Sequence, residues 1–123
     1  MEINNKLNNF VVIFEDVLPK KTLEVFLKVC KSQYAKYDAA SIDVGQIDKK
    51  IRDADTWELI SDLSNITGIH WGNFLKKIFQ DKITEYKKQI NCEDADSIIN
   101  SMQVLKYQKK QHYLFHTDHF TLC

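Results

Sequence analysis

Hydrophobic residues recur at helical spacing in two stretches of the chain. The longer stretch, residues 71–90, carries a wide apolar stripe, and lysines are prominent among the intervening positions. The shorter stretch begins at Pro19, a residue suited to the first turn of a helix, and its apolar positions continue through Phe26 and Cys30 to Tyr34. The pattern predicts two amphipathic helices, each with one face toward a core and a charged face toward solvent.

Shorter apolar runs predict strands near both ends of the chain. Residues 10–14 (FVVIF) are aromatic and β-branched, and residues 113–120 are extended and rich in aromatic side chains. Residues 98–107 alternate in such a way that Met102 and Val104 share one face of a predicted strand. Each of these runs therefore predicts a strand rather than a helix.

The segment between the two helices has no single period. Residues 38–55 are polar and predict a loop or a short strand, with residues 46–52 as the most extended part. Thr56 is a permissible N-cap, and the apolar residues after it predict a short helix over 57–63. The order strand, helix, loop, helix, strand, strand predicts an α+β fold, and 123 residues are enough for one domain.

Composition narrows the classes of function. Lys plus Arg number 17 and Asp plus Glu number 17, and this neutrality argues against nucleic acid as the main partner. No apolar run has the length of a membrane-spanning helix, so we expect no membrane partner. The three cysteines are widely spaced and suggest no disulfide framework, which predicts a reducing, cytoplasmic location. Nothing in the composition indicates the oligomeric state.

The residues best suited to bind a metal lie near the C-terminal end of the sequence. His116 and Asp118 are two positions apart, and on a strand such residues project from the same face. An imidazole and a carboxylate aimed at one ion are two ligands of the two-His-one-carboxylate triad, which binds Fe(II) and leaves positions open for a co-substrate. Taken alone the pair is a weak signal, because His-x-Asp arises readily by chance.

The residues before this pair make the pattern more specific. A strand-like Val-Leu-Lys-Tyr segment ends at Tyr107, Tyr113 follows after five intervening residues, and His116 lies three positions later. This spacing, Tyr-x5-Tyr-x2-His-x-Asp, resembles the prolyl 4-hydroxylase branch of the 2-oxoglutarate- and Fe(II)-dependent dioxygenases. The resemblance implies that His116 and Asp118 are iron ligands. It also implies that Tyr107 lies beside the 2-oxoglutarate pocket and that Tyr113 lies near the metal.

The resemblance also implies a fold and an activity. It implies helices packed on a double-stranded β-helix (jelly-roll or cupin-like) sheet, and a dioxygenase that hydroxylates a peptide or protein side chain with ascorbate as reductant. The family's distal His and its 2-oxoglutarate-binding basic residue lie several strands beyond the His-x-Asp pair, whereas the sequence ends at Cys123. We therefore expect residues 1–123 to be a single partial domain, the N-terminal portion of an oxygenase domain with an incomplete sheet, and to be inactive alone.

Two further features concern the surroundings of this motif. The turn between the two tyrosines usually carries glycines in the family, but this chain has Lys109, Lys110 and Gln111 there. Arg52 is the sole arginine of the chain, and we expect it on the helical and loop side of the fold.

Two alternatives to the oxygenase hypothesis remain open. His112, His116 and His119 would line one side of a helix and suit a three-His zinc site, although the aromatic residues around them favour a strand and Tyr113 replaces the catalytic Glu of helical zinc proteases. The other alternative is a small non-catalytic α+β module that binds a partner through an exposed sheet edge near Phe120.

Overall fold

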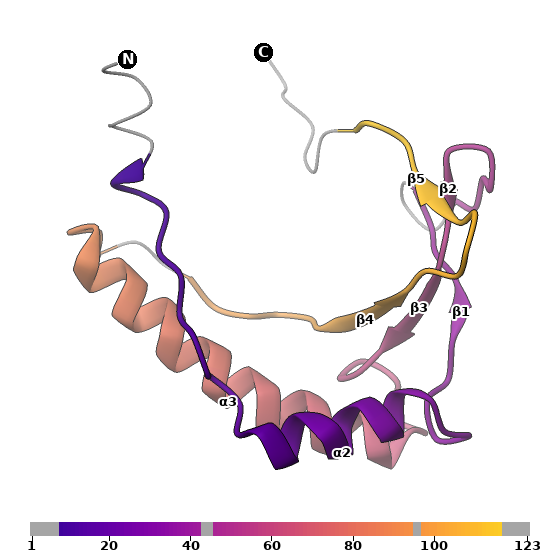
Figure 1. The fold of residues 1–123 in the computed structure, drawn as a ribbon, viewed down its shortest axis with the longest axis horizontal. Helices are drawn as coiled ribbons and strands as arrows, with labels where there is room; N and C mark the ends of the chain where they lie inside the picture. The colour runs from indigo at the N-terminus through magenta and orange to yellow at the C-terminus, as the bar shows by residue number, and fades with distance from the viewer. Residues whose placement is uncertain (1–7, 43–45, 95–96, 117–123) are drawn as a thin grey trace.

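The computed structural model describes residues 8–42, 46–94 and 97–116, which form two helices and two small antiparallel sheets (Figure 1). The helices are α2 (Lys20–Cys30) and α3 (Ile66–Gln89). One sheet has the order β1–β3–β4, formed by Asp38–Ala39, Asp55–Glu58 and Gln103–Lys106. The second sheet pairs β2 (Arg52–Asp53) with β5 (His112–Tyr113). The predicted α+β class is confirmed.

The described elements form an open arch (Figure 1). The helices make its base, an irregular N-terminal arm of residues 8–19 rises on one side, and the strands rise on the other. The arm lies along α3, because the Tyr86 hydroxyl donates a hydrogen bond to the Phe10 carbonyl (2.7 Å) and the Lys82 ammonium lies 5.3 Å from the centre of the Phe14 ring. The strand predicted over 10–14 is wrong, since this run borders a helix and pairs with no strand among the described residues.

α2 confirms the first predicted helix but is shorter than its apolar pattern suggests. It ends at Cys30, before Tyr34, and Pro19 precedes it as the N-cap residue. Phe26 projects from its middle onto Trp71 of α3, with the two ring centroids 4.9 Å apart. This tilted aromatic contact joins the two helices at the base of the arch.

α3 confirms the second predicted helix and extends further toward the N-terminus. Asn65 caps its first turn by accepting a hydrogen bond from the Gly68 N–H (2.9 Å). At its other end Asn91 has a left-handed φ of 58°, and the Cys92 N–H donates to the Lys87 carbonyl (2.9 Å). These bonds satisfy backbone groups that a helix end would otherwise leave unpaired.

The core is small and centres on Trp57, Leu59 and Leu75, each at most 4% exposed. Trp57 and Leu59 lie in and just after β3, and Leu75 projects from α3. Met102 and Val104 pack against this cluster, so the shared face predicted for them is confirmed.

Two glycines on α3 allow it to approach the core so closely. A Cβ on Gly68 would lie 3.0 Å from the Leu59 carbonyl oxygen, and one on Gly72 would lie 2.6 Å from Ile60 Cγ1. The two positions are one helical turn apart and face the same neighbour. The helix can therefore contact the backbone after β3 only where it carries no side chain.

Several predictions for the middle of the chain are wrong. Residues 57–63 do not begin a helix, because Trp57 pairs with Val104 and the β3–β4 ladder extends to Glu58. The loop or short strand predicted over 38–55 is observed as a loop with two short strands, β1 and β2. Its expected extended part, residues 46–52, instead includes a turn in which the Ile51 N–H donates to the Asp48 carbonyl (3.1 Å). The conformation of these segments is determined by tertiary strand pairing, which their local sequence patterns do not indicate.

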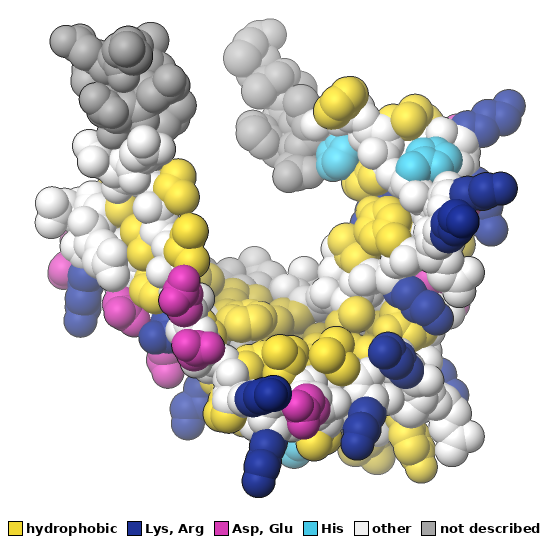
Figure 2. Space-filling view, in the orientation of Figure 1, with side chains coloured by type: hydrophobic (Ala, Val, Ile, Leu, Met, Phe, Trp, Pro, Cys, Tyr) yellow, Lys and Arg dark blue, Asp and Glu magenta, His cyan; other side chains and the backbone are white. Residues whose placement is uncertain are grey.

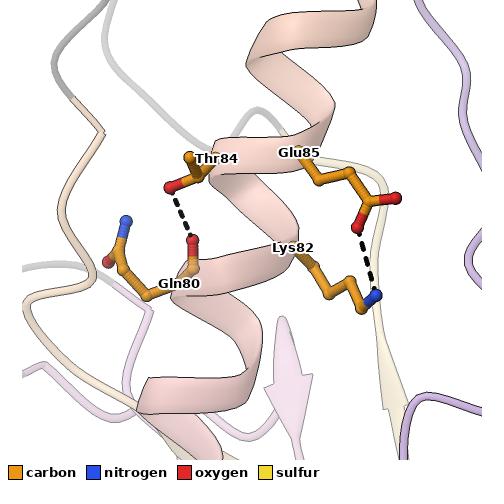
Figure 3. A network of polar contacts seen from close by, with 4 residues as sticks. All are labelled: Gln80, Lys82, Thr84 and Glu85. Carbon is orange, nitrogen blue, oxygen red and sulfur yellow. Dashed lines mark hydrogen bonds and ion pairs between the residues drawn. The ribbon is translucent and has the colours of Figure 1, made fainter.

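The predicted C-terminal strands are shorter than their apolar runs. β4 occupies only part of residues 98–107. Of residues 113–116, the described part of the second run, only Tyr113 lies in a strand, where it follows His112 in β5. Gln80 of α3 holds the chain that leads into β4: its amide nitrogen donates to the Ser97 carbonyl (2.6 Å) and its amide oxygen accepts from the Ile99 N–H (3.0 Å). Figure 3 shows Gln80 on the helix, with the Thr84 hydroxyl donating to its carbonyl (3.1 Å).

The two glycines give a direct test of this packing. We expect Gly72→Ala to lower the free energy of unfolding by about 1 kcal/mol, because the cost of overpacking exceeds the gain in helix propensity. Asn73→Ala changes the next, exposed position and should leave the stability unchanged or slightly raised. Urea denaturation followed by circular dichroism measures both. Equal stabilisation by the two substitutions would contradict the close approach.

Candidate functional site

β5 places the C-terminal aromatic residues beside the sole arginine of the chain. In the antiparallel β2–β5 pair, Tyr113 is the register partner of Arg52, and the Leu114 N–H donates to the Ile51 carbonyl (2.9 Å). Arg52 therefore lies in a strand next to the motif, and its expected location on the helical and loop side is wrong.

Arg52, Tyr113 and His116 form a stacked cluster. The guanidinium carbon of Arg52 lies 4.6 Å from the centre of the Tyr113 ring, close enough for a cation–π contact. The rings of Tyr113 and His116 are nearly parallel, with an angle of 7° between their planes and 3.5 Å between their centroids. Arg52 is held from its other side, because one terminal nitrogen donates to the Ser41 carbonyl (2.8 Å). The Tyr113 ring is therefore the common contact of an imidazole and a guanidinium.

A backbone hydrogen bond determines which nitrogen of His116 can bind a metal. Nδ1 lies 2.8 Å from the Leu114 carbonyl oxygen. Because a carbonyl oxygen only accepts, Nδ1 carries the proton in this contact and the lone pair of the neutral ring is on Nε2. Histidines that bind metals through one nitrogen generally donate the other N–H in this manner. The Nδ1 contact of His116 is therefore compatible with metal binding through Nε2.

His112 has a different environment. It lies in β5, and its Nε2 is 3.1 Å from the Lys50 carbonyl oxygen, so Nε2 is the protonated nitrogen in that contact. Residues 112–116 are not helical, which removes the helical arrangement expected for a zinc site built from His112 and His116. His119, the third residue of that alternative, lies outside the described residues.

The turn between the two tyrosines is closed by glutamine contacts. The Gln111 backbone N–H donates to the Gln108 carbonyl (3.0 Å), and the side-chain oxygen of Gln111 accepts from the Gln108 N–H (2.6 Å). Gln111 also donates through its side-chain nitrogen to the Asp53 carboxylate (3.1 Å). Lys110 has a φ of 75°, in the left-handed region that favours glycine. The backbone thus adopts a glycine-type conformation where the sequence carries lysine.

The four predicted site residues do not all lie together. Tyr113 and His116 are in contact, whereas Tyr107 lies at the end of β4 and lines a groove that Tyr113 does not line. Asp118 lies outside the described residues. Sequence reasoning missed the contribution of Arg52, because a two-residue strand pairing distant parts of the chain leaves no periodic signal.

A groove with a volume of about 360 Å³ lies at Tyr107. Its walls come from the end of α2, from Tyr37 and from β4. The Tyr37 hydroxyl donates to the Cys30 carbonyl (2.9 Å) across the back of the groove. Burial raises the pKa of the Cys30 thiol and that of the Tyr37 phenol above their ordinary values, so both are neutral near pH 7.

Three further observations concern metal-binding groups, membrane-spanning helices and similarity to known proteins. Within residues 8–42, 46–94 and 97–116, no three His, Cys, Asp or Glu side chains come together as a metal-binding group. None of the described helices carries an apolar stretch long enough to cross a membrane. Comparison of the chain with protein-family models, curated proteins and solved structures gave no match.

The left-handed turn yields one stability prediction. Lys110→Gly should raise the free energy of unfolding by about 0.5 kcal/mol, since relief of the left-handed conformation exceeds the added entropy of the unfolded chain. Lys109→Gly has no such strain to relieve and should lower the stability by a similar amount. Thermal unfolding of the two variants measures the difference. A destabilised Lys110→Gly protein would contradict the turn geometry.

The stacked cluster yields a second prediction. In a double-mutant cycle, Arg52→Met and Tyr113→Leu should show a coupling energy of about 0.5–1 kcal/mol, as expected for a partly exposed cation–π contact. Arg52→Met combined with Tyr107→Leu is the matched control, and its effects should add. Urea unfolding of the single and double variants supplies the energies. Additive effects in the Tyr113 cycle would exclude an energetic contact.

Proposed function

We propose that this chain belongs to a Fe(II)- and 2-oxoglutarate-dependent dioxygenase of the prolyl 4-hydroxylase type, which hydroxylates a peptide or protein side chain. The observation that carries the proposal is the state of His116: its Nδ1–H is bound to the Leu114 carbonyl, and its ring is stacked on Tyr113. These features hold the ring with its lone pair on Nε2, the nitrogen that would bind the metal. The spacing that resembles the family thus coincides with a histidine of metal-ligand geometry.

The turn before β5 also supports the proposal. The family usually has glycines between its two tyrosines, and the absence of glycine from Lys109 to Gln111 is the main departure from its pattern. Lys110 nevertheless has the left-handed φ of 75° that a glycine would favour. A conformation compatible with the family's turn is therefore retained despite the changed residue types.

In the proposed site each residue has a separate task. His116 would hold Fe(II) through Nε2, and Asp118, two positions later, would supply a carboxylate oxygen. Bound iron would supply the redox chemistry by which 2-oxoglutarate and O₂ oxidise an unactivated C–H bond. Tyr113 restricts the rotation of the His116 ring and shields one of its faces from water. Tyr107, whose side chain is 45% exposed, would donate its hydroxyl to a carboxylate of 2-oxoglutarate.

Other parts of the proposal rest on the resemblance and the composition. A jelly-roll sheet, ascorbate as reductant and a peptide or protein substrate follow from the family resemblance alone. The neutral charge balance favours such a substrate over nucleic acid, and the unpaired cysteine pattern favours the cytoplasm.

Metal binding tests the proposal directly. We expect the chain to bind Fe(II) under anaerobic conditions, and we expect His116→Ala and Asp118→Ala each to weaken binding by at least about tenfold, since each removes a ligand. 2-Oxoglutarate should tighten Fe(II) binding by the wild-type chain, because both would share one coordination sphere. Isothermal titration calorimetry measures both effects, and circular dichroism checks that the variants fold.

His112→Ala is the matched control. It removes a histidine from the same segment, but one whose Nε2 is engaged with the Lys50 carbonyl. Fe(II) affinity should therefore remain at the wild-type value in this variant. Equal losses in the His112 and His116 variants, or no effect of His116→Ala, would overturn the iron proposal.

A further inference from the structure

β4 is an edge strand whose free side has a defined set of backbone groups. It is the last strand in the order β1–β3–β4, and no other described strand pairs with it. The Leu59 N–H donates to the Met102 carbonyl (3.0 Å), which fixes the phase of the ladder. Because antiparallel partners alternate between bonded and non-bonded pairs, Val104 directs its backbone groups toward β3. Gln103 and Leu105 therefore direct their N–H and C=O groups outward, away from the sheet.

The groove of about 360 Å³ runs along this same edge. It is lined by four consecutive residues that start at Val104 and end at Tyr107. Successive side chains of a strand point to opposite faces, so the lining includes residues of both faces of the strand. The opposite wall is the last turn of α2, with Phe26, Leu27 and Cys30. An extended segment placed against β4 would thus have α2 on its far side.

The charges around the groove are of one sign. Lys31 and Lys106 are the only charged residues that line it among those described. The Lys106 ammonium lies 5.1 Å from the centre of the Tyr37 ring, at the mouth of the groove. Neither lysine is within 4.0 Å of a described carboxylate, in contrast to the surface pair Lys82–Glu85 on α3 (Figure 3).

The surface view agrees with this arrangement. Figure 2 shows hydrophobic atoms in the hollow between the helical base and the strands, and Lys and Arg side chains gathered around its strand side. Asp and Glu side chains gather mainly on the opposite side of the arch, near the N-terminal arm. The groove itself is lined mainly by apolar and aromatic residues, with Lys31 and Lys106 as its charged residues.

We propose that the edge of β4 binds an extended acidic peptide segment of a partner protein, which adds a strand to the sheet. Its backbone would pair with the outward groups of Gln103 and Leu105, and its apolar side chains would enter the groove against α2. Its Glu or Asp side chains would meet Lys31 and Lys106. The residues that line this groove do not include Tyr113 or His116, and the peptide site needs no metal.

The charge pattern selects this occupant over a second copy of the chain. Pairing of two β4 edges would bring two grooves with the same lysines together, and like charges at such an interface oppose association. A single β4 strand of four residues spans about 13 Å, which suits a short linear segment better than a folded surface. The volume of the groove lies at the small end of ligand-sized sites, enough for large apolar side chains from such a segment.

The probe is a fluorescein-labelled peptide, acetyl-Ser-Glu-Val-Glu-Phe-Glu-Ser-amide, and its control is the same peptide with lysine at each glutamate. Fluorescence anisotropy at low salt should show the acidic peptide binding about tenfold tighter than the basic one. Lys31→Glu should weaken binding of the acidic peptide about threefold, as expected for an exposed ion pair. Lys21→Glu makes the same charge change at the other end of α2 and should have no effect.

Backbone pairing is tested independently of charge. Peptides N-methylated at alternate residues lose the donors needed for strand addition, and one of the two N-methyl registers should fail to bind. Leu105→Pro removes an outward N–H while leaving the bonds to β3 in place, so it should abolish binding of the unmodified probe. The N-methyl series keeps the test decisive even where the proline variant fails to fold.

Cysteine alkylation locates the bound peptide. The probe should protect Cys30, in the groove wall, from N-ethylmaleimide, and leave the exposed Cys92 as reactive as before. Binding without protection of Cys30, binding insensitive to N-methylation in both registers, or equal binding of the acidic and basic peptides would overturn the proposal. So would dimerisation of the chain that Leu105→Pro abolishes, because the edge would then be occupied by a second copy. His116→Ala should bind the probe normally, which separates this result from the iron proposal.

Discussion

The whole arrangement depends on how closely α3 approaches the backbone that follows β3. Gly68 and Gly72 make that approach sterically possible, and Leu59 is the residue that both of them face. With the helix in this position, Trp57 and Leu59 are removed from water almost completely, and Leu75 closes the cluster from the helix side. A small fold with few buried side chains has a low free energy of unfolding, so the loss of this one closely packed contact would destabilise the whole fold.

This packing also determines which residues of β4 are buried and which are exposed. The helices cover one face of the β1–β3–β4 sheet, and Val104 turns inward to meet them. The alternation of a strand then requires Leu105 to turn outward, where it remains 43% exposed. The same strand that completes the core thus supplies an open edge and an apolar wall. The burial of Val104 and the exposure of Leu105 both follow from the register in which β4 pairs with β3.

The sequence predicts what depends on local periodicity and misses what depends on partners. The stripe over 71–90 is long enough to identify α3, and Asn65 is a capping residue at its start. The spacing of the apolar positions after Thr56 also fits a helix. Trp57 nevertheless lies in β3, because it pairs with Val104 of β4. Within the site, the contact of Tyr113 with His116 joins residues three apart, so spacing could indicate it. The position of Arg52 could not be predicted, because it depends on a two-residue strand pairing.

The two proposed sites share Tyr107. Its ring lines the groove beside β4, and the resemblance assigns its hydroxyl to 2-oxoglutarate. The turn that follows Tyr107 contains Lys110 in a left-handed conformation and leads directly to β5, the strand that carries Tyr113. A peptide in the groove and a co-substrate near His116 would therefore bias the same short segment. If both ligands bind, thermodynamic linkage requires each to change the affinity of the other by the same factor, whichever sign that factor takes. Tyr107 is thus the residue through which the proposed peptide-binding site and the proposed catalytic site would be linked.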